Sequence, residues 1–175
     1  MTAGGLRVNP LGAAQVWEVA TARPVTPPLR HDFRPGKNPG VGIQFAAFSP
    51  DGRRVITVSA NQVQAWDAAG GQPLGLPLRQ PTEIWHQTLS PDGSRILIVN
   101  VAARVWDLAS QQPVTPPLHL EGFCQYATFS PDGRYLVTVG RDRVARVWEA
   151  ATGQPITPPL KHDSDIRYAA FTPGG

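Results

Sequence analysis

A four-residue turn recurs along this chain at a nearly constant interval. Ser-Pro-Asp-Gly begins at Ser49, Ser90 and Ser130, and a degraded copy, Thr-Pro-Gly-Gly, begins at Thr172, so that successive steps are 41, 40 and 42 residues. A tryptophan within a Val/Ala-Trp-Asp/Glu segment repeats in the same phase, as does a run of an apolar residue followed by Thr-Pro-Pro-Leu. Three landmarks in one phase indicate a repeat architecture, in which each repeat is one supersecondary unit.

Each repeat predicts four short strands, here given for the second copy. Strand A, residues 43–48, precedes the turn, and strand B, residues 55–58, follows it because Pro and Gly supply the backbone angles of a tight turn. Strand C, residues 63–66, carries the tryptophan. Strand D is the segment 74–78, which keeps only part of the Thr-Pro-Pro-Leu run. Proline cannot donate to a strand ladder, so strand D is expected at the edge of each sheet.

These landmarks resemble the WD-repeat family of the bacterial type, whose period is about 40–45 residues. The resemblance implies an all-β fold, a β-propeller of four-stranded antiparallel blades with four blades' worth of sequence in the chain. The 17 glycines and 19 prolines among 175 residues agree with many short strands and turns. The expected units are one propeller segment over 1–175, with a split blade (1–32 with 166–175) and blades at about 41–79, 83–119 and 123–161.

The resemblance also implies a structural hydrogen-bond framework in each blade, formed by a Trp, a hydroxyl, a turn Asp and a loop His. Trp148, Asp142 and His162 fit that pattern, with Thr138 as a candidate hydroxyl. The tryptophans assigned to the framework are the four repeat-equivalent ones, Trp17, Trp66, Trp106 and Trp148.

The split blade predicts how a ring would close. Read in register, residues 6–11 and Ala14–Trp17 are strands B and C of one unit, and Ile166–Phe171 is strand A of another. Two chains that exchange these strands would form an eight-bladed homodimer, an arrangement that covers unpaired strand edges. The alternative is that the sequence is an excerpt of a longer propeller.

Catalytic, cofactor and metal sites are not expected. His31-Asp32 and His162-Asp163 suggest a hydrolase, but they occupy one repeat-equivalent position and the chain has no Gly-x-Ser-x-Gly motif. A metal site at 162–165 would need further ligands. Cys124 follows Phe123 in a strand and is expected to be a buried, unreactive thiol.

The composition limits the class of partner and the cellular compartment that are expected. The net charge of +3 comes from scattered bases, which does not indicate specific nucleic-acid binding. No apolar run approaches the roughly 18 residues of a membrane span, and a single cysteine fits the reducing cytoplasm.

One position varies among the repeats at the start of strand A, where Trp85 has Gln44, Gln125 and Arg167 as its equivalents. Trp85 is predicted either to bind a partner or to act as a wedge between neighbouring blades. The partner-binding residues expected on the loop face are Arg30, His31, Arg34, Lys37, Trp85, Arg141 and Lys161.

The predicted function is a non-catalytic protein-interaction scaffold whose partner is a protein or peptide, with an acidic one favoured by the charge of this face. The alternatives are a sensor or accessory propeller segment of a larger signalling protein such as a bacterial kinase, and an enzyme with its site at the propeller mouth.

Overall fold

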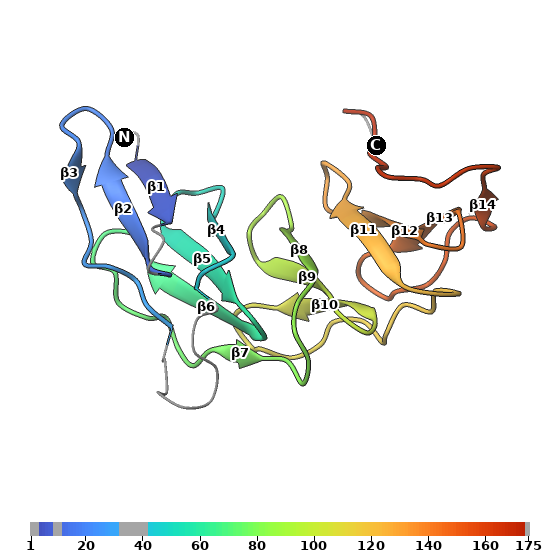
Figure 1. Ribbon diagram of the computed structural model, residues 1–175, viewed down its shortest axis with the longest axis horizontal. Coiled ribbons are helices and arrows are strands. Elements are labelled where there is room, and N and C mark those ends of the chain that lie inside the picture. Colours follow the sequence, from blue (N-terminus) through green and yellow to red (C-terminus); the bar gives the residue numbers. More distant parts are fainter. Residues whose placement is uncertain (1–3, 9–11, 32–41, 174–175) are drawn as a thin grey trace. The chain divides into compact units, whose positions relative to one another are not determined.

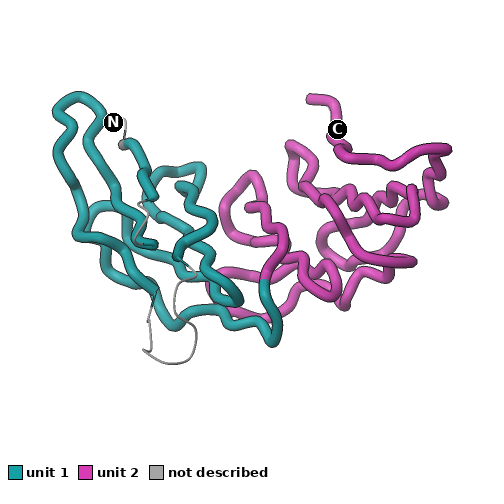
Figure 2. Tube along the Cα trace, viewed as in Figure 1, with its two compact units in different colours: residues 1–83 teal, residues 84–175 magenta. Residues whose placement is uncertain are grey.

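The computed structural model describes residues 4–8, 12–31 and 42–173. Within these ranges the chain forms fourteen strands and no helix (Figure 1). The strands belong to four antiparallel sheets, as expected for an all-β chain of the β-propeller type. They fall into two compact units, residues 1–83 and 84–175 (Figure 2). The part of the chain that is described contains no helix of the length and apolarity needed to cross a membrane.

The first unit contains a three-stranded and a four-stranded sheet, each with its strands in sequence order. The strands of the first sheet are β1 (Gly4–Val8), β2 (Ala14–Glu18) and β3 (Arg23–Pro24). The strands of the second are β4 (Phe45–Phe48), β5 (Arg54–Ser59), β6 (Gln62–Asp67) and β7 (Leu78–Arg79). The Ser-Pro-Asp-Gly turn joins β4 to β5, so strands A, B and C of this copy form as the sequence predicts.

The second unit repeats this plan. Its three-stranded sheet has the order β10-β9-β8 and its four-stranded sheet the order β11-β12-β13-β14. The strands of the first are β8 (His86–Leu89), β9 (Arg95–Val99) and β10 (Ala103–Asp107). The strands of the second are β11 (Cys124–Phe129), β12 (Tyr135–Gly140), β13 (Val144–Glu149) and β14 (Leu160–Lys161).

Each unit has a core between its two sheets. In the second unit, Leu97 and Val105 of one sheet pack with Ala127, Leu136 and Trp148 of the other. The whole run 96–99 of β9 is buried, and it reads as an unbroken apolar segment in the sequence.

The proline runs lie at sheet edges and barely pair. In the second and fourth sheets, strand D is reduced to the two-residue strands β7 and β14, and the Pro-Pro pairs lie outside every ladder. Thr26 and Thr115 of these runs are buried, and their hydroxyls accept hydrogen bonds of 3.2 Å from the backbone N–H groups of Val16 and Val105. The threonine side chain therefore provides the contact that the prolines cannot make.

Residues 166–171, expected as a strand A, do not form a strand. Instead, Ile166, Ala169 and Phe171 pack as a partly buried layer against the face of the fourth sheet that carries Val137 and Val139. A strand requires a hydrogen-bonded neighbour, and the described part of the second unit provides no further strand B beside this segment. Its apolar side chains are nevertheless held on the sheet by packing, and the centroid of the Tyr168 ring lies 5.0 Å from that of the Tyr126 ring.

Candidate binding pocket

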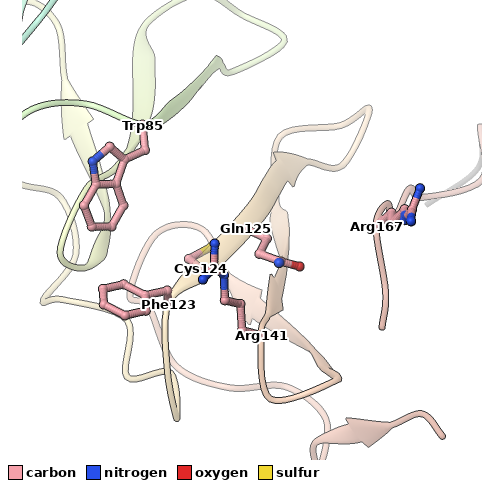
Figure 3. Close-up of a pocket in the computed structure, with 6 residues that line it drawn as sticks. All are labelled: Trp85, Phe123, Cys124, Gln125, Arg141 and Arg167. Atoms are coloured by element: carbon pink, nitrogen blue, oxygen red, sulfur yellow. The ribbon is translucent and has the colours of Figure 1, made fainter. Parts of the chain in front are cut away.

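The second unit contains a pocket of about 590 Å³ at the start of β8 and β11 (Figure 3). Its lining comes from four short segments: one before β8, one at the start of β11, one after β12 and one near residue 167. The lining residues are Trp85, Phe123, Cys124, Gln125, Arg141 and Arg167. Three of them, Trp85, Gln125 and Arg167, are the repeat-equivalent residues that vary at the start of strand A.

Two aromatic side chains are exposed at this pocket. Trp85 is 51% and Phe123 55% exposed, and their ring centroids lie 5.7 Å apart at an interplanar angle of 61°, an edge-to-face contact. Their backbones are fixed, because the Trp85 N–H donates to the Val99 carbonyl at 2.9 Å and the Arg141 N–H donates to the Phe123 carbonyl at 3.0 Å. The rings thus project from ordered backbone while half of each surface remains in contact with water.

Arg141 and Arg167 give the pocket its positive charge. Both are exposed, and within the described ranges neither forms an ion pair. The ion pairs of the neighbouring arginines are Arg143–Asp165 at 3.9 Å, Arg146–Asp142 at 2.9 Å and Arg146–Glu121 at 4.0 Å. Other arginines therefore occupy the nearby carboxylates, and the two guanidinium groups of the pocket keep their hydrogen-bond donors available.

Cys124 contributes a buried thiol to the lining. Burial raises its pKa to about 11, against an ordinary value of 9.0. The thiol lies 3.4 Å from the Tyr126 carbonyl, to which it donates. At neutral pH the group is protonated, and a thiol is a poor nucleophile and a poor metal ligand compared with the thiolate. Over the described ranges, no three His, Cys, Asp or Glu side chains gather in a group that could hold a metal ion.

The structure brings together part of the predicted partner surface. Trp85 and Arg141 line the same pocket, and the Trp85 ring contacts Phe123 of the neighbouring sheet, as a wedge would, while half of it stays exposed. Lys161 is exposed on β14 outside the lining, and Arg30 is exposed in the first unit. Arg34 and Lys37 lie outside the described residues. The partner role of these residues remains a prediction.

Sequence reasoning did not include Phe123, Gln125 and Arg167 in the site. The internal repeat held a signal for two of them, since Gln125 and Arg167 are the equivalents of Trp85. No repeat signal indicated Phe123, whose ring comes beside Trp85 because β11 packs beside β8.

His31 takes part in a buried hydrogen-bond network of the first unit. The Trp66 indole N–H donates to the Thr57 hydroxyl at 2.8 Å, and the same hydroxyl lies 2.7 Å from His31 Nε2. The His31 and Trp66 rings also contact each other edge to face. A residue expected on the partner surface thus has a structural contact with the blade framework.

The residues assigned to the framework in the fourth sheet make separate contacts. The Trp148 indole N–H donates to the Thr138 hydroxyl at 2.9 Å. Asp142 accepts from Arg146 at 2.9 Å and from the backbone of Val144 at 3.3 Å. The His162 side chain is exposed, and its backbone N–H donates to the Arg143 carbonyl at 3.0 Å.

The other two framework tryptophans lack a hydroxyl partner. In register, Ile98 occupies the position of Thr57 and Thr138 beside Trp106, and Arg7 occupies it beside Trp17. Among the described residues, the indole nitrogens of Trp17 and Trp106 have no hydrogen-bond partner, and both side chains are half-buried rather than buried. The hydroxyl therefore accompanies the two buried tryptophans, Trp66 of β6 and Trp148 of β13.

Comparison with known proteins supports the fold. Residues 118–149, which include β11 to β13, match the family model described as WD domain, G-beta repeat. No curated protein matches the sequence. The crystal structure of the computationally designed Ika8 protein is similar, with a TM-score of 0.70 and 19% sequence identity over 95% of this chain and 48% of that one. The chain thus spans about half the length of that protein.

Proposed function

We propose that this chain is a non-catalytic protein-interaction scaffold and that the pocket of Trp85 and Arg141 is its recognition site. The observation that supports this most directly is the pair of exposed aromatic rings beside two arginines without ion-pair partners. Trp and Arg are enriched among the residues that contribute most to binding energy. Exposed aromatic surface on ordered backbone is also a feature of interaction sites. The WD-repeat match at 118–149 is in line with a scaffold role.

The chemistry of the lining favours binding over catalysis. Its one nucleophilic group, Cys124, has a pKa of about 11 and stays protonated at neutral pH. Gln125 and the two arginines offer hydrogen bonds but no general base, since a guanidinium stays protonated in proteins. Cys124 is also the single cysteine of the chain, which fits action in the cytoplasm.

Affinity purification from the native host tests this function. Proteins retained by the wild-type chain should be lost with Trp85→Ala and kept with Leu76→Ala, a control that removes an exposed apolar side chain, 79% exposed, from the first unit. If both variants retain the same proteins as the wild type, the pocket is not the recognition site. Retention of no specific protein by the wild-type chain would contradict the scaffold role.

We also propose that two copies associate by exchange of terminal strands into an eight-bladed ring. Ile166, Ala169 and Phe171 already pack on the fourth sheet, and the outer edge of β1 has no strand partner among the described residues.

Light scattering should give twice the 18.9 kDa mass of the chain. Deletion of residues 166–175 should reduce the mass to that of one chain, because it removes the segment that would pair as a strand with the second copy. A monomer at micromolar concentration for the full chain would refute the exchange.

A further inference from the structure

We infer that the pocket of the second unit binds an extended peptide in which an anionic side chain stands near an aromatic or large aliphatic one. This inference rests on the proposed scaffold function and assigns the chemistry of its ligand. It follows from the arrangement of the lining: the two aromatic rings lie together at one side of the pocket and Arg167 at the other (Figure 3). The pocket therefore has an apolar end and a cationic end.

The apolar end is formed by Trp85 and Phe123. Their edge-to-face contact leaves about half of each side chain exposed, so a further apolar side chain can pack on both rings without moving them. Burial of such surface is favourable in proportion to its area, and ordered backbone at both residues means that little freedom is lost on binding.

Two arginines supply the positive charge: Arg167 lies at the cationic end, and Arg141 lies beside Cys124, between the rings and Arg167 (Figure 3). Neither has an ion-pair partner among the described residues, and the lining contains no acidic side chain. The planar guanidinium donates two parallel hydrogen bonds to a carboxylate or a phosphate. The shared chemistry of the ligand is thus a single anionic group, which an Asp or Glu carboxylate or a phosphoserine would supply.

The charges around the pocket argue for a peptide rather than a nucleic acid. Glu121 is two residues before Phe123 and its side chain is 90% exposed, and Asp165 is two residues before Arg167 and its side chain is 82% exposed. An isolated anionic side chain avoids these carboxylates, whereas a phosphate backbone with one charge per nucleotide would be repelled by them. Gln125 adds an exposed amide to the lining, which can both donate to and accept from a peptide backbone.

A phage-displayed library of random 12-residue peptides, selected on the intact protein, provides the probe. We expect the enriched peptides to share an Asp or Glu close to an aromatic or large aliphatic residue. The best peptide is then synthesised with a fluorescent label, and its affinity is measured by fluorescence anisotropy in three forms: with its acidic residue kept, replaced by the uncharged amide, and replaced by phosphoserine.

Arg141→Gln and Arg167→Gln should each weaken binding of the acidic peptide by about fivefold to tenfold, because one charge-assisted contact is lost. Arg134→Gln is the matched control: Arg134 is exposed outside the lining and lies over the Tyr135 ring, and its loss should change affinity by less than about twofold. The amide form of the peptide should bind the wild-type protein about as weakly as the acidic peptide binds the arginine variants. The phosphoserine form should bind the wild-type protein with retained affinity. Circular dichroism confirms that each variant is folded.

Two outcomes would overturn the inference but leave a scaffold function intact. The selected peptides could lack an anionic residue, or the acidic peptide could bind both arginine variants as tightly as it binds the wild-type protein. Displacement of the peptide by a 20-nucleotide oligothymidine at equal concentration would also overturn the inference, since the pocket would then bind nucleic acid. Recovery of no peptide at all would overturn the inference, whereas the proposed scaffold function is decided separately by the affinity purification.

Discussion

The Thr57 hydroxyl contacts the buried Trp66 indole and the half-buried His31 ring, and its removal gives a direct measure of this hydrogen-bond network. Thr57 is fully buried, accepts a hydrogen bond from the Trp66 indole and contacts His31 Nε2, and its hydroxyl also lies 3.5 Å from the Gln64 carbonyl oxygen, a long and weak contact. Thr57→Val replaces the hydroxyl by a methyl group of similar size, so the change removes hydrogen bonds while it preserves packing. Thr138→Val provides the comparison, because the Thr138 hydroxyl accepts from Trp148 alone in the described network.

The magnitude follows from the groups left unsatisfied. A buried donor deprived of its partner costs about 1–3 kcal/mol, so Thr138→Val should lower the free energy of unfolding by about that amount. Thr57→Val should cost about 1 kcal/mol more, because a second hydrogen bond is lost. The methyl group that replaces each hydroxyl offsets a similar part of the loss in both variants. The difference between their free energies of unfolding is therefore the more secure quantity.

Urea denaturation followed by far-UV circular dichroism measures both changes, provided that the slope of the transition is unaltered. Thr152→Val is the control: the Thr152 hydroxyl donates to exposed Glu149 at 2.6 Å, and its loss should change stability by less than about 0.5 kcal/mol. Equal losses for Thr57→Val and Thr138→Val, or losses no larger than that of the control, would refute the assignment of these hydroxyls to a stabilising framework.

Three further outcomes follow from single features of the structure. Ala60 has a φ of 48° between β5 and β6, and Ala60→Asn should raise stability by up to about 1 kcal/mol, because Asn adopts this conformation at lower cost; a lower melting temperature would contradict this. Hydrogen bonds, first from the Ser90 hydroxyl, lower the pKa of Asp92 below its ordinary value of 3.8. Ionised Asp92 therefore stabilises the fold above pH 3.8, and this contribution is lost as the pH falls through the pKa of the folded state. Ser90→Ala should therefore be less stable at pH 7 and lose less on acidification from pH 5 to pH 3, and urea midpoints that keep the wild-type pH dependence would argue against this role. Cys124 should react slowly with iodoacetamide at pH 8, with a rate that rises toward its pKa of about 11, whereas mass spectrometry that shows rapid labelling of the native chain would mean that the thiol is not buried.

Much of the fold could be predicted from the sequence because its causes are local. The Ser-Pro-Asp-Gly turns set the boundaries of β5, β9 and β12, and the β-branched runs after them form the inner strands. The prolines placed strand D at the edge, which needs only the rule that proline lacks a backbone donor. Residues 166–171 departed from the prediction, since a strand depends on a neighbour as well as on its own pattern.

The site was less accessible to sequence reasoning. The variable position of Trp85 was visible by comparing one repeat with the next, but its value as half of an aromatic pair depends on Phe123, 38 residues further along the chain. The charge of the pocket likewise depends on which arginines are already paired, and Arg143 and Arg146 differ from Arg141 in this respect through ion pairs that spacing does not specify.

The sequence by itself determined the repeat, the turns, the inner strands and the edge position of the proline runs, because each follows from backbone chemistry over a few residues. Only the tertiary structure decided that His31 contacts the Thr57 hydroxyl, 26 residues away, and that four separate segments line one pocket. Such contacts arise when two sheets pack and bring distant side chains together, and the exposure and pairing of each charge are fixed by that packing rather than by its place in the repeat.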